Sequence, residues 1–132
     1  MNKERILALA DLVEQQPHSI ESGFNMGELI HGCGTPSCIA GWAAWESAGR
    51  PEMMVAEEGY AIENEASDWL GLPHIVESSY ATDLSFDLFY PIGFGFDDIT
   101  PKHAAFTLRR LAETGKVDWR AYGNEALREP SL

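Results

Sequence analysis

The chain has 132 residues, of which 45% are hydrophobic and 11% aromatic, and it carries a formal net charge of −12. This length and composition allow a packed core, so we expect one folded domain over residues 1–132 and not a disordered chain. The negative charge disfavours direct nucleic-acid binding, which needs positive charge to neutralise phosphates. No apolar run approaches the roughly 18 residues that span a bilayer, and the start of the chain lacks the pattern of a signal segment. We therefore expect a cytoplasmic protein with no membrane partner.

The first predicted element is a helix over residues 2–16, ended by Pro17. Its apolar side chains recur at helical spacing: Ile6, Leu9, Ala10 and Val13. A glycine-rich irregular loop follows over residues 17–34. Four apolar side chains are expected to fasten this loop to the core: Phe24, Met26, Leu29 and Ile30.

The most informative segment is residues 33–44, Cys-Gly-Thr-Pro-Ser-Cys-Ile-Ala-Gly-Trp-Ala-Ala, which predicts the start of a buried helix over residues 36–48. Thr35 is the expected N-cap and Pro36 the first helical residue. Cys38 then falls near the third helical position, where unpaired N–H groups and the helix dipole favour a thiolate. This helix has few polar positions, so we expect it to be the central one, with small residues that let another helix approach closely.

Two further helices are predicted in the middle of the chain. One ends at residues 69–70 with Gly71 after its last turn, and a shorter one covers residues 83–89. An aromatic loop over residues 90–96 follows. Its aromatic side chains either face a partner or fold inward.

The last strong helix is predicted between a Thr-Pro start at residues 100–101 and Gly115. The segment after it is expected to dock on the core through Trp119 and Tyr122, and residues 129–132 are expected to fray. No segment alternates with period two over enough residues to argue for a substantial sheet. The predicted fold is all-α, a single compact bundle of five or six helices around the central Cys/Trp/Ala-rich helix.

Negative charge is concentrated in the middle of the chain, because residues 51–101 contain no Lys or Arg. They contain eleven acids: Glu52, Glu57, Glu58, Glu63, Glu65, Asp68, Glu77, Asp83, Asp87, Asp97 and Asp98. This pattern is typical of a solvated acidic surface, and it also suits a basic partner or mimicry of DNA. Metal binding by these carboxylates has no support from an EF-hand-like spacing.

The two cysteines, Cys33 and Cys38, are expected to be reduced thiols in a cytoplasmic protein. Cys38 with a histidine such as His31 is the candidate catalytic pair of a cysteine hydrolase. His31, Cys33 and Cys38 are the candidate ligands of a zinc site, although only one half of the usual ligand pattern is present. A switchable disulfide between the cysteines is a third option. We favour a packing role for Cys38, which assigns no catalytic residue, no metal and no cofactor.

Four segments carry a resemblance to other proteins: CGTPSCIAGWA at residues 33–43, WLGL at 69–72, LFYP at 88–91, and the stretch at 100–119 that ends LRRLAETGKVDW. Together they resemble a group of small uncharacterised bacterial and phage-associated proteins with a Cys-Gly-Thr-x-x-Cys-x-Ala-Gly-Trp core. The similarity covers residues 33–119. The group has no established activity, so the resemblance implies a bacterial or phage-associated cytoplasmic origin and no catalytic residue or ligand.

The expected function follows from the acid-rich middle segment and from the lack of a complete catalytic constellation. We expect a small acidic protein that is not an enzyme and that acts through contact with another, basic protein. The alternative is a small thiol- or zinc-dependent enzyme centred on Cys38.

Overall fold

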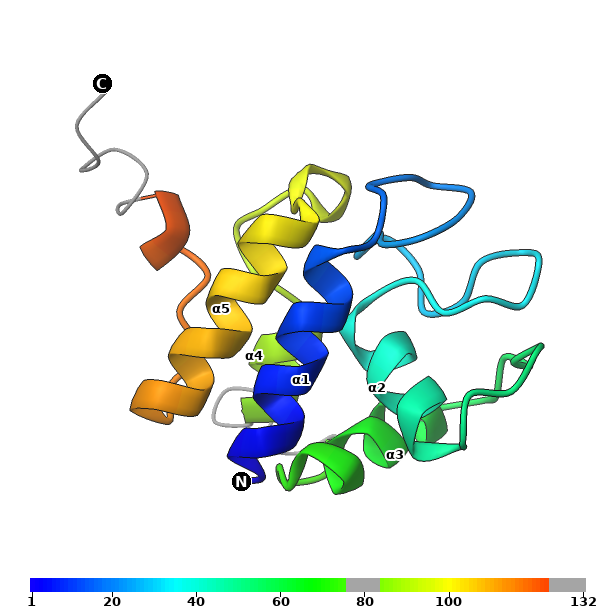
Figure 1. Cartoon of the computed structure of the whole chain (residues 1–132), viewed down its shortest axis with the longest axis horizontal. Coiled ribbons are helices and arrows are strands. Elements are labelled where there is room, and N and C mark those ends of the chain that lie inside the picture. Colours follow the sequence, from blue (N-terminus) through cyan, green and yellow to red (C-terminus); the bar gives the residue numbers. More distant parts are fainter. Residues whose placement is uncertain (76–83, 124–132) are drawn as a thin grey trace.

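The computed structural model describes residues 1–75 and 84–123. It is built from helices joined by long irregular segments (Figure 1). The elements in chain order are α1 (Lys3–Glu14), α2 (Ile39–Ser47), α3 (Ala61–Leu70), α4 (Leu84–Phe89), the 3-10 helix η2 (Phe96–Asp98) and α5 (Pro101–Thr114). Within the described ranges there is no strand, and β-type pairing is limited to two isolated bridges. The prediction of an all-α fold is confirmed.

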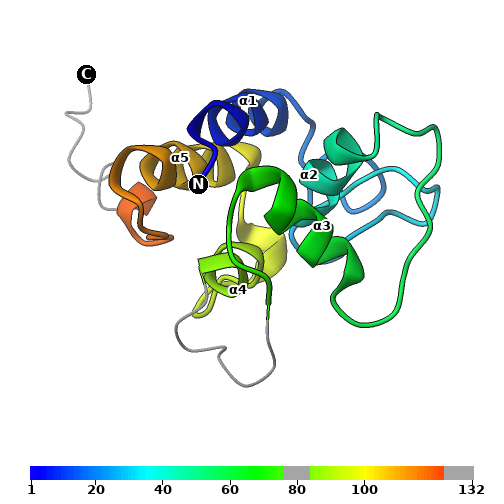
Figure 2. The same ribbon diagram turned by 90° about the horizontal axis from the view of Figure 1, so that it is seen from below.

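The helices are arranged in two pairs. α1 runs alongside α5, α2 packs against α3, and α4 contacts both α2 and α3 (Figures 1 and 2). Arg109 of α5 ties the first pair together, because its guanidinium donates to Glu14 at 3.0 Å and to Asp11 at 2.8 Å. α2 contacts α1, α3 and α4, which agrees with the central position predicted for it.

One cluster of buried apolar side chains runs through all five α-helices. Its fully buried members include Ile6, Leu9, Ile39, Leu70, Leu88, Leu108 and Leu111. Each such side chain contributes about 1.5–3 kcal/mol relative to its exposed state. The cluster also includes Phe24 and Met26, so the predicted anchors of the long loop do reach the core.

Most helix ends lie where the sequence predicts them. α3 ends before Gly71, which adopts the left-handed conformation at φ 71°, and α5 ends before Gly115 at φ 77°. The Thr100 hydroxyl caps α5 by accepting from the His103 N–H at 3.1 Å. α1 is shorter than the predicted 2–16, because the Asn2 side chain caps it and Glu14 is its last residue.

The start of α2 differs from the prediction, since the helix begins at Ile39 and not at Pro36. The preceding residues are held extended by backbone hydrogen bonds to the long loop. The Ser37 N–H donates to the Leu29 carbonyl at 3.0 Å, and the Thr35 carbonyl accepts from the His31 N–H at 2.8 Å. These hydrogen bonds engage backbone groups of the residues that would form a helical turn beginning at Pro36. The prediction that Thr35 is the N-cap is therefore wrong.

The close approach expected on α2 is made by a loop and not only by a helix. Gly41 lies directly under the carbonyl oxygen of Leu29, and a Cβ at this position would stand 2.1 Å from that oxygen. Only glycine fits such a contact.

The segment after α5 folds back onto the core as predicted. Trp119 is buried, and its indole N–H donates to the Asp87 carbonyl at 2.8 Å. Tyr122 stacks on His103 with ring centroids 4.9 Å apart. The prediction that residues 129–132 fray falls outside the described residues, as does residue 83 at the predicted start of α4.

The aromatic loop before α5 divides its side chains between the core and the surface. Phe94 packs edge-on against His103, with centroids 5.4 Å apart. Phe96 and Ile92 remain exposed. In the part of the chain that the structure describes, no helix is long and apolar enough to cross a bilayer.

Candidate functional site

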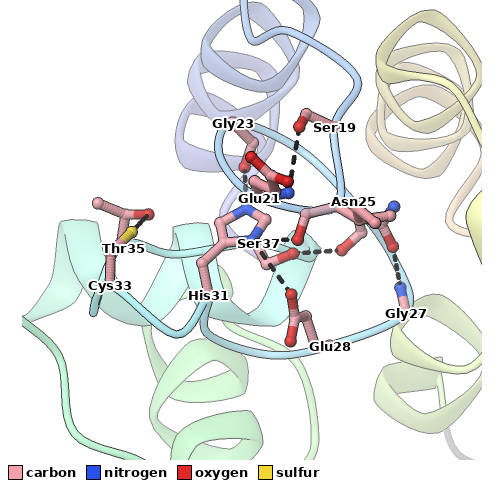
Figure 3. A network of polar contacts seen from close by, with 11 residues as sticks. Ser19, Glu21, Gly23, Asn25, Gly27, Glu28, His31, Cys33, Thr35 and Ser37 are labelled. Carbon is pink, nitrogen blue, oxygen red and sulfur yellow. Dashed lines mark hydrogen bonds and ion pairs between the residues drawn. The ribbon is translucent and has the colours of Figure 1, made fainter.

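The long loop before α2 is organised around a buried histidine, His31 (Figure 3). Its Nδ1 lies 3.2 Å from Glu28 Oε1 and 3.3 Å from the Ile20 carbonyl oxygen. Its Nε2 lies 3.0 Å from the Gly23 carbonyl oxygen. Both ring nitrogens therefore face oxygen atoms, and the ring links distant parts of the loop.

A second group of hydrogen bonds holds the loop against the head of α2. The Ser37 hydroxyl donates to the Asn25 carbonyl at 2.7 Å, and the Asn25 N–H donates to the Ser37 carbonyl at 3.1 Å. The Asn25 side-chain oxygen accepts from the Gly27 N–H at 2.6 Å (Figure 3). Because its polar groups are satisfied internally, this buried stretch can form one wall of a site.

The two cysteines occupy opposite environments, and both are free thiols. Cys33 is exposed, and a hydrogen bond with the Thr35 hydroxyl, at 3.2 Å, lowers the pKa of its thiol. Cys38 is the N-cap residue of α2 and is buried. Burial raises the pKa of the Cys38 thiol to about 11, and the N–H groups of Gly41 and Ala40 act in the opposite direction with smaller effect. The loss of water around the sulfur therefore outweighs the helix terminus, which alone would favour a thiolate at Cys38.

The candidate catalytic and zinc-binding residues do not come together. Across residues 1–75 and 84–123, no group of three or more His, Cys, Asp or Glu side chains is placed to hold a metal ion. The ring of His31 is engaged by Glu28 and by backbone carbonyls, and no hydrogen bond joins it to Cys38. Cys33 bonds instead to Thr35. Within the described chain, Cys38 therefore has the surroundings of a packing residue.

A cavity of about 160 Å³ lies beside Cys38, between the long loop, the head of α2 and the segment that follows α4. Its lining residues are Met26, Gly27, Glu28, Leu29, Cys38, Phe89, Tyr90 and Phe96. The walls are mainly apolar, and the only carboxylate among them belongs to Glu28. An apolar cavity with few polar groups is typical of a binding site for a small group or a side chain.

One wall of this cavity is supported by a buried polar pair. The Tyr90 hydroxyl donates to Glu63 Oε2 of α3, and Glu63 is only 2% exposed. Burial, and then the hydrogen bond to Glu63, raise the pKa of Tyr90, so the phenol stays neutral. The second carboxyl oxygen, Glu63 Oε1, has no hydrogen-bond partner among the described residues.

Sequence reasoning missed both members of this pair, although a signal for one of them exists. Glu63 precedes Ala66 by three residues and Leu70 by seven, so it shares their face of α3. A carboxylate on the apolar face of a helix indicates a buried polar contact. Nothing in the sequence identifies Tyr90 as its partner.

The chain was compared with protein-family models, with curated proteins and with solved structures, and none of them matches. Its function is therefore inferred from its own residues.

Proposed function

We propose that this protein acts by binding another protein, that it is not an enzyme, and that its partner is basic. The observation that carries the proposal is the exposure of apolar side chains in the acid-rich middle segment, residues 51–101, which contains no Lys or Arg. Among the described residues of this segment, four large hydrophobic side chains are open to solvent: Met53 at 67%, Val55 at 75%, Ile92 at 75% and Phe96 at 36%. Exposed acids lie beside them in the chain: Glu52, Glu57, Glu58, Asp97 and Asp98.

Exposed apolar side chains next to exposed carboxylates are the composition expected of a protein-binding surface. Exposed apolar side chains gain free energy when a partner covers them. The carboxylates next to them in the chain attract positively charged partners and repel negatively charged ones, which speeds association and selects the partner. Two of the acids in the segment, Glu77 and Asp83, lie outside the described residues.

A cytoplasmic location is part of the same proposal. Free thiols persist in a reducing compartment, and both Cys33 and Cys38 are unpaired. The enzymatic alternative centred on Cys38 has less support, because burial keeps that thiol protonated and the His31 ring is occupied by oxygen atoms.

The proposal is tested by placing a photo-reactive amino acid at position 55 and identifying the proteins that it cross-links in a native lysate. We expect one specific, Lys- or Arg-rich protein at low salt and its loss at high salt, because salt screens the attraction. The absence of any specific cross-link at either salt concentration would contradict the proposal.

A matched pair of charge variants makes this test sharper. Three substitutions in the acid-rich middle segment, Glu52→Gln, Glu57→Gln and Glu58→Gln, should abolish the cross-link. Three substitutions of exposed acids elsewhere, Glu4→Gln, Glu21→Gln and Glu113→Gln, change the net charge equally and should leave it intact. Equal loss in both variants would show that only total charge matters, and the proposed surface would be rejected.

A further inference from the structure

The cavity beside Cys38 has the size of one apolar side chain. At about 160 Å³ it is comparable to the apolar cavity of about 150 Å³ that holds a benzene ring in another protein. Its walls include Met26, Leu29, Phe89 and Phe96. A methionine side chain adapts to the shape of an inserted ring, and aromatic side chains make favourable edge-on or offset contacts with one.

The cavity reaches from the core to the surface. Cys38 is buried on one side of it, while Glu28 and Phe96 on its lining are partly exposed, with 45% of the Glu28 side chain and 36% of Phe96 open to solvent. A group that enters from solvent therefore passes Glu28 and Phe96 before it meets the thiol. The long loop that carries Glu28 is fixed by its hydrogen bonds, so this wall is preformed.

The mouth of the cavity carries negative charge. The Asp97 carboxylate lies close to Gly27 on the lining, since a Cβ on Gly27 would stand 2.7 Å from Asp97 Oδ1. Within the part of the chain that the structure describes, neither Asp97 nor Asp98 forms an ion pair, and Glu28 pairs only with His31. No Lys or Arg lines the cavity.

We propose that this cavity receives one aromatic side chain of the size of phenylalanine from the partner protein, next to a Lys or Arg that pairs with Glu28 or Asp97. This inference rests on the proposed function and specifies its recognition chemistry. An aromatic anchor in a preformed pocket is the usual source of binding energy at a protein interface. The acids at the mouth make a basic neighbour favourable, and an acidic one is repelled.

The test uses three short peptides, acetylated and amidated at their ends, with the isotope-labelled full chain. They are Lys-Lys-Phe-Lys-Lys, the same peptide with Ala in place of Phe, and Glu-Glu-Phe-Glu-Glu. Binding is followed by NMR at the Met26 methyl group and at the Phe89 ring. We expect saturable shifts with the first peptide, and binding weaker by about tenfold or more with each of the others.

Two variants with matched controls locate the contact. Phe96→Ala removes a partly exposed wall and should weaken binding of Lys-Lys-Phe-Lys-Lys, whereas Leu7→Ala removes an exposed apolar side chain outside the lining and should not. Glu28→Gln keeps an oxygen for His31 but removes the charge, and should weaken binding by about twofold to fivefold. Glu113→Gln removes an exposed carboxylate outside the lining and should leave binding unchanged.

Three outcomes would overturn the inference. One is equal binding of the Phe and Ala peptides, and another is a set of shifts that excludes Met26 and Phe89. The third is binding of free 2-phenylethylamine as tightly as the peptide, which would indicate a small-molecule pocket. If the peptides fail while the salt-sensitive cross-link at position 55 persists, only this inference falls. If that cross-link is absent, the proposed function fails independently of the peptide result.

Discussion

The carbonyl oxygen of Leu29 lies against Gly41 of α2, 2.1 Å from the place where a Cβ would stand. Gly41→Ala should therefore displace the loop from the helix and lower the free energy of unfolding by about 1–3 kcal/mol, measured by urea denaturation. The control is Gly32→Ala in the same loop, where a Cβ would meet no atom within 4 Å. Equal stability of the two variants would contradict the close contact.

Removal of the Tyr90 hydroxyl should destabilise the fold through its partner Glu63. Tyr90→Phe leaves the buried carboxyl group of Glu63 without a hydrogen-bond donor among the described side chains, which costs about 1–3 kcal/mol. Glu63→Leu in the same chain removes that unsatisfied group, so the double variant should be more stable than the sum of the single effects predicts. Denaturation of all four proteins completes this cycle, and strictly additive effects would argue against the pair.

The buried thiol of Cys38 should make stability fall at high pH. Its pKa is raised from the ordinary 9.0 to about 11 in the folded protein. Between these values the folded state holds a proton that the unfolded chain has lost, so the free energy of unfolding decreases as pH rises. Below pH 9 the contribution of this thiol is fully present and constant.

The measurement compares Cys33→Ser with the double variant Cys33→Ser, Cys38→Ser, because the other titrating groups then cancel. The stability difference between them should shift by about 2 kcal/mol between pH 9 and pH 11, in favour of the double variant. A difference that stays constant over this range would show that Cys38 is not protected from water.

The same contrast between the cysteines predicts selective alkylation. Cys33 is exposed and its pKa is lowered by Thr35, so iodoacetamide at neutral pH should modify it first. Cys38 should react only when the protein opens, at a rate that rises with denaturant. Peptide mass spectrometry gives both rates, and comparable rates in the folded protein would contradict the burial of Cys38.

The link between α1 and α5 through Arg109 should make a small contribution that depends on salt. Its two acidic partners, Asp11 and Glu14, are partly or largely exposed, so Arg109→Met should cost about 1 kcal/mol or less. The loss should shrink at high ionic strength. Lys116→Met, which removes an exposed cation without an ion pair in the described structure, serves as the control.

Sequence patterns predicted those parts of the fold that depend on local signals. Thr100 with Pro101, and Gly71 and Gly115, mark helix ends because each acts within one turn of its own position. Thr35 with Pro36 carries the same local signal as the start of α5, but the Thr35 and Ser37 backbone is paired with the long loop. Such pairing depends on the path of residues 25–31 and outweighs a local cap preference.

The candidate site was predicted in part. The segment around Cys38 borders the cavity, and its sulfur is buried, so the start of the helix does not produce a thiolate there. The other side of the cavity comes from Phe89, Tyr90 and Phe96, about fifty residues further along the chain. No periodicity or spacing within a single helix encodes that meeting, which follows from how α4 packs against α2 and α3.

The pairing of α1 with α5 has a consequence for the order in which the chain folds. Arg109 and Glu14 are separated by 95 positions in the sequence, while α2 and α3 are neighbours along the chain. During synthesis the ribosome releases α2 and α3 well before α5, so their contact can form first. Most of the apolar side of α1, which carries Ile6 and Leu9, stays uncovered until α5 emerges, because α5 is its main packing partner.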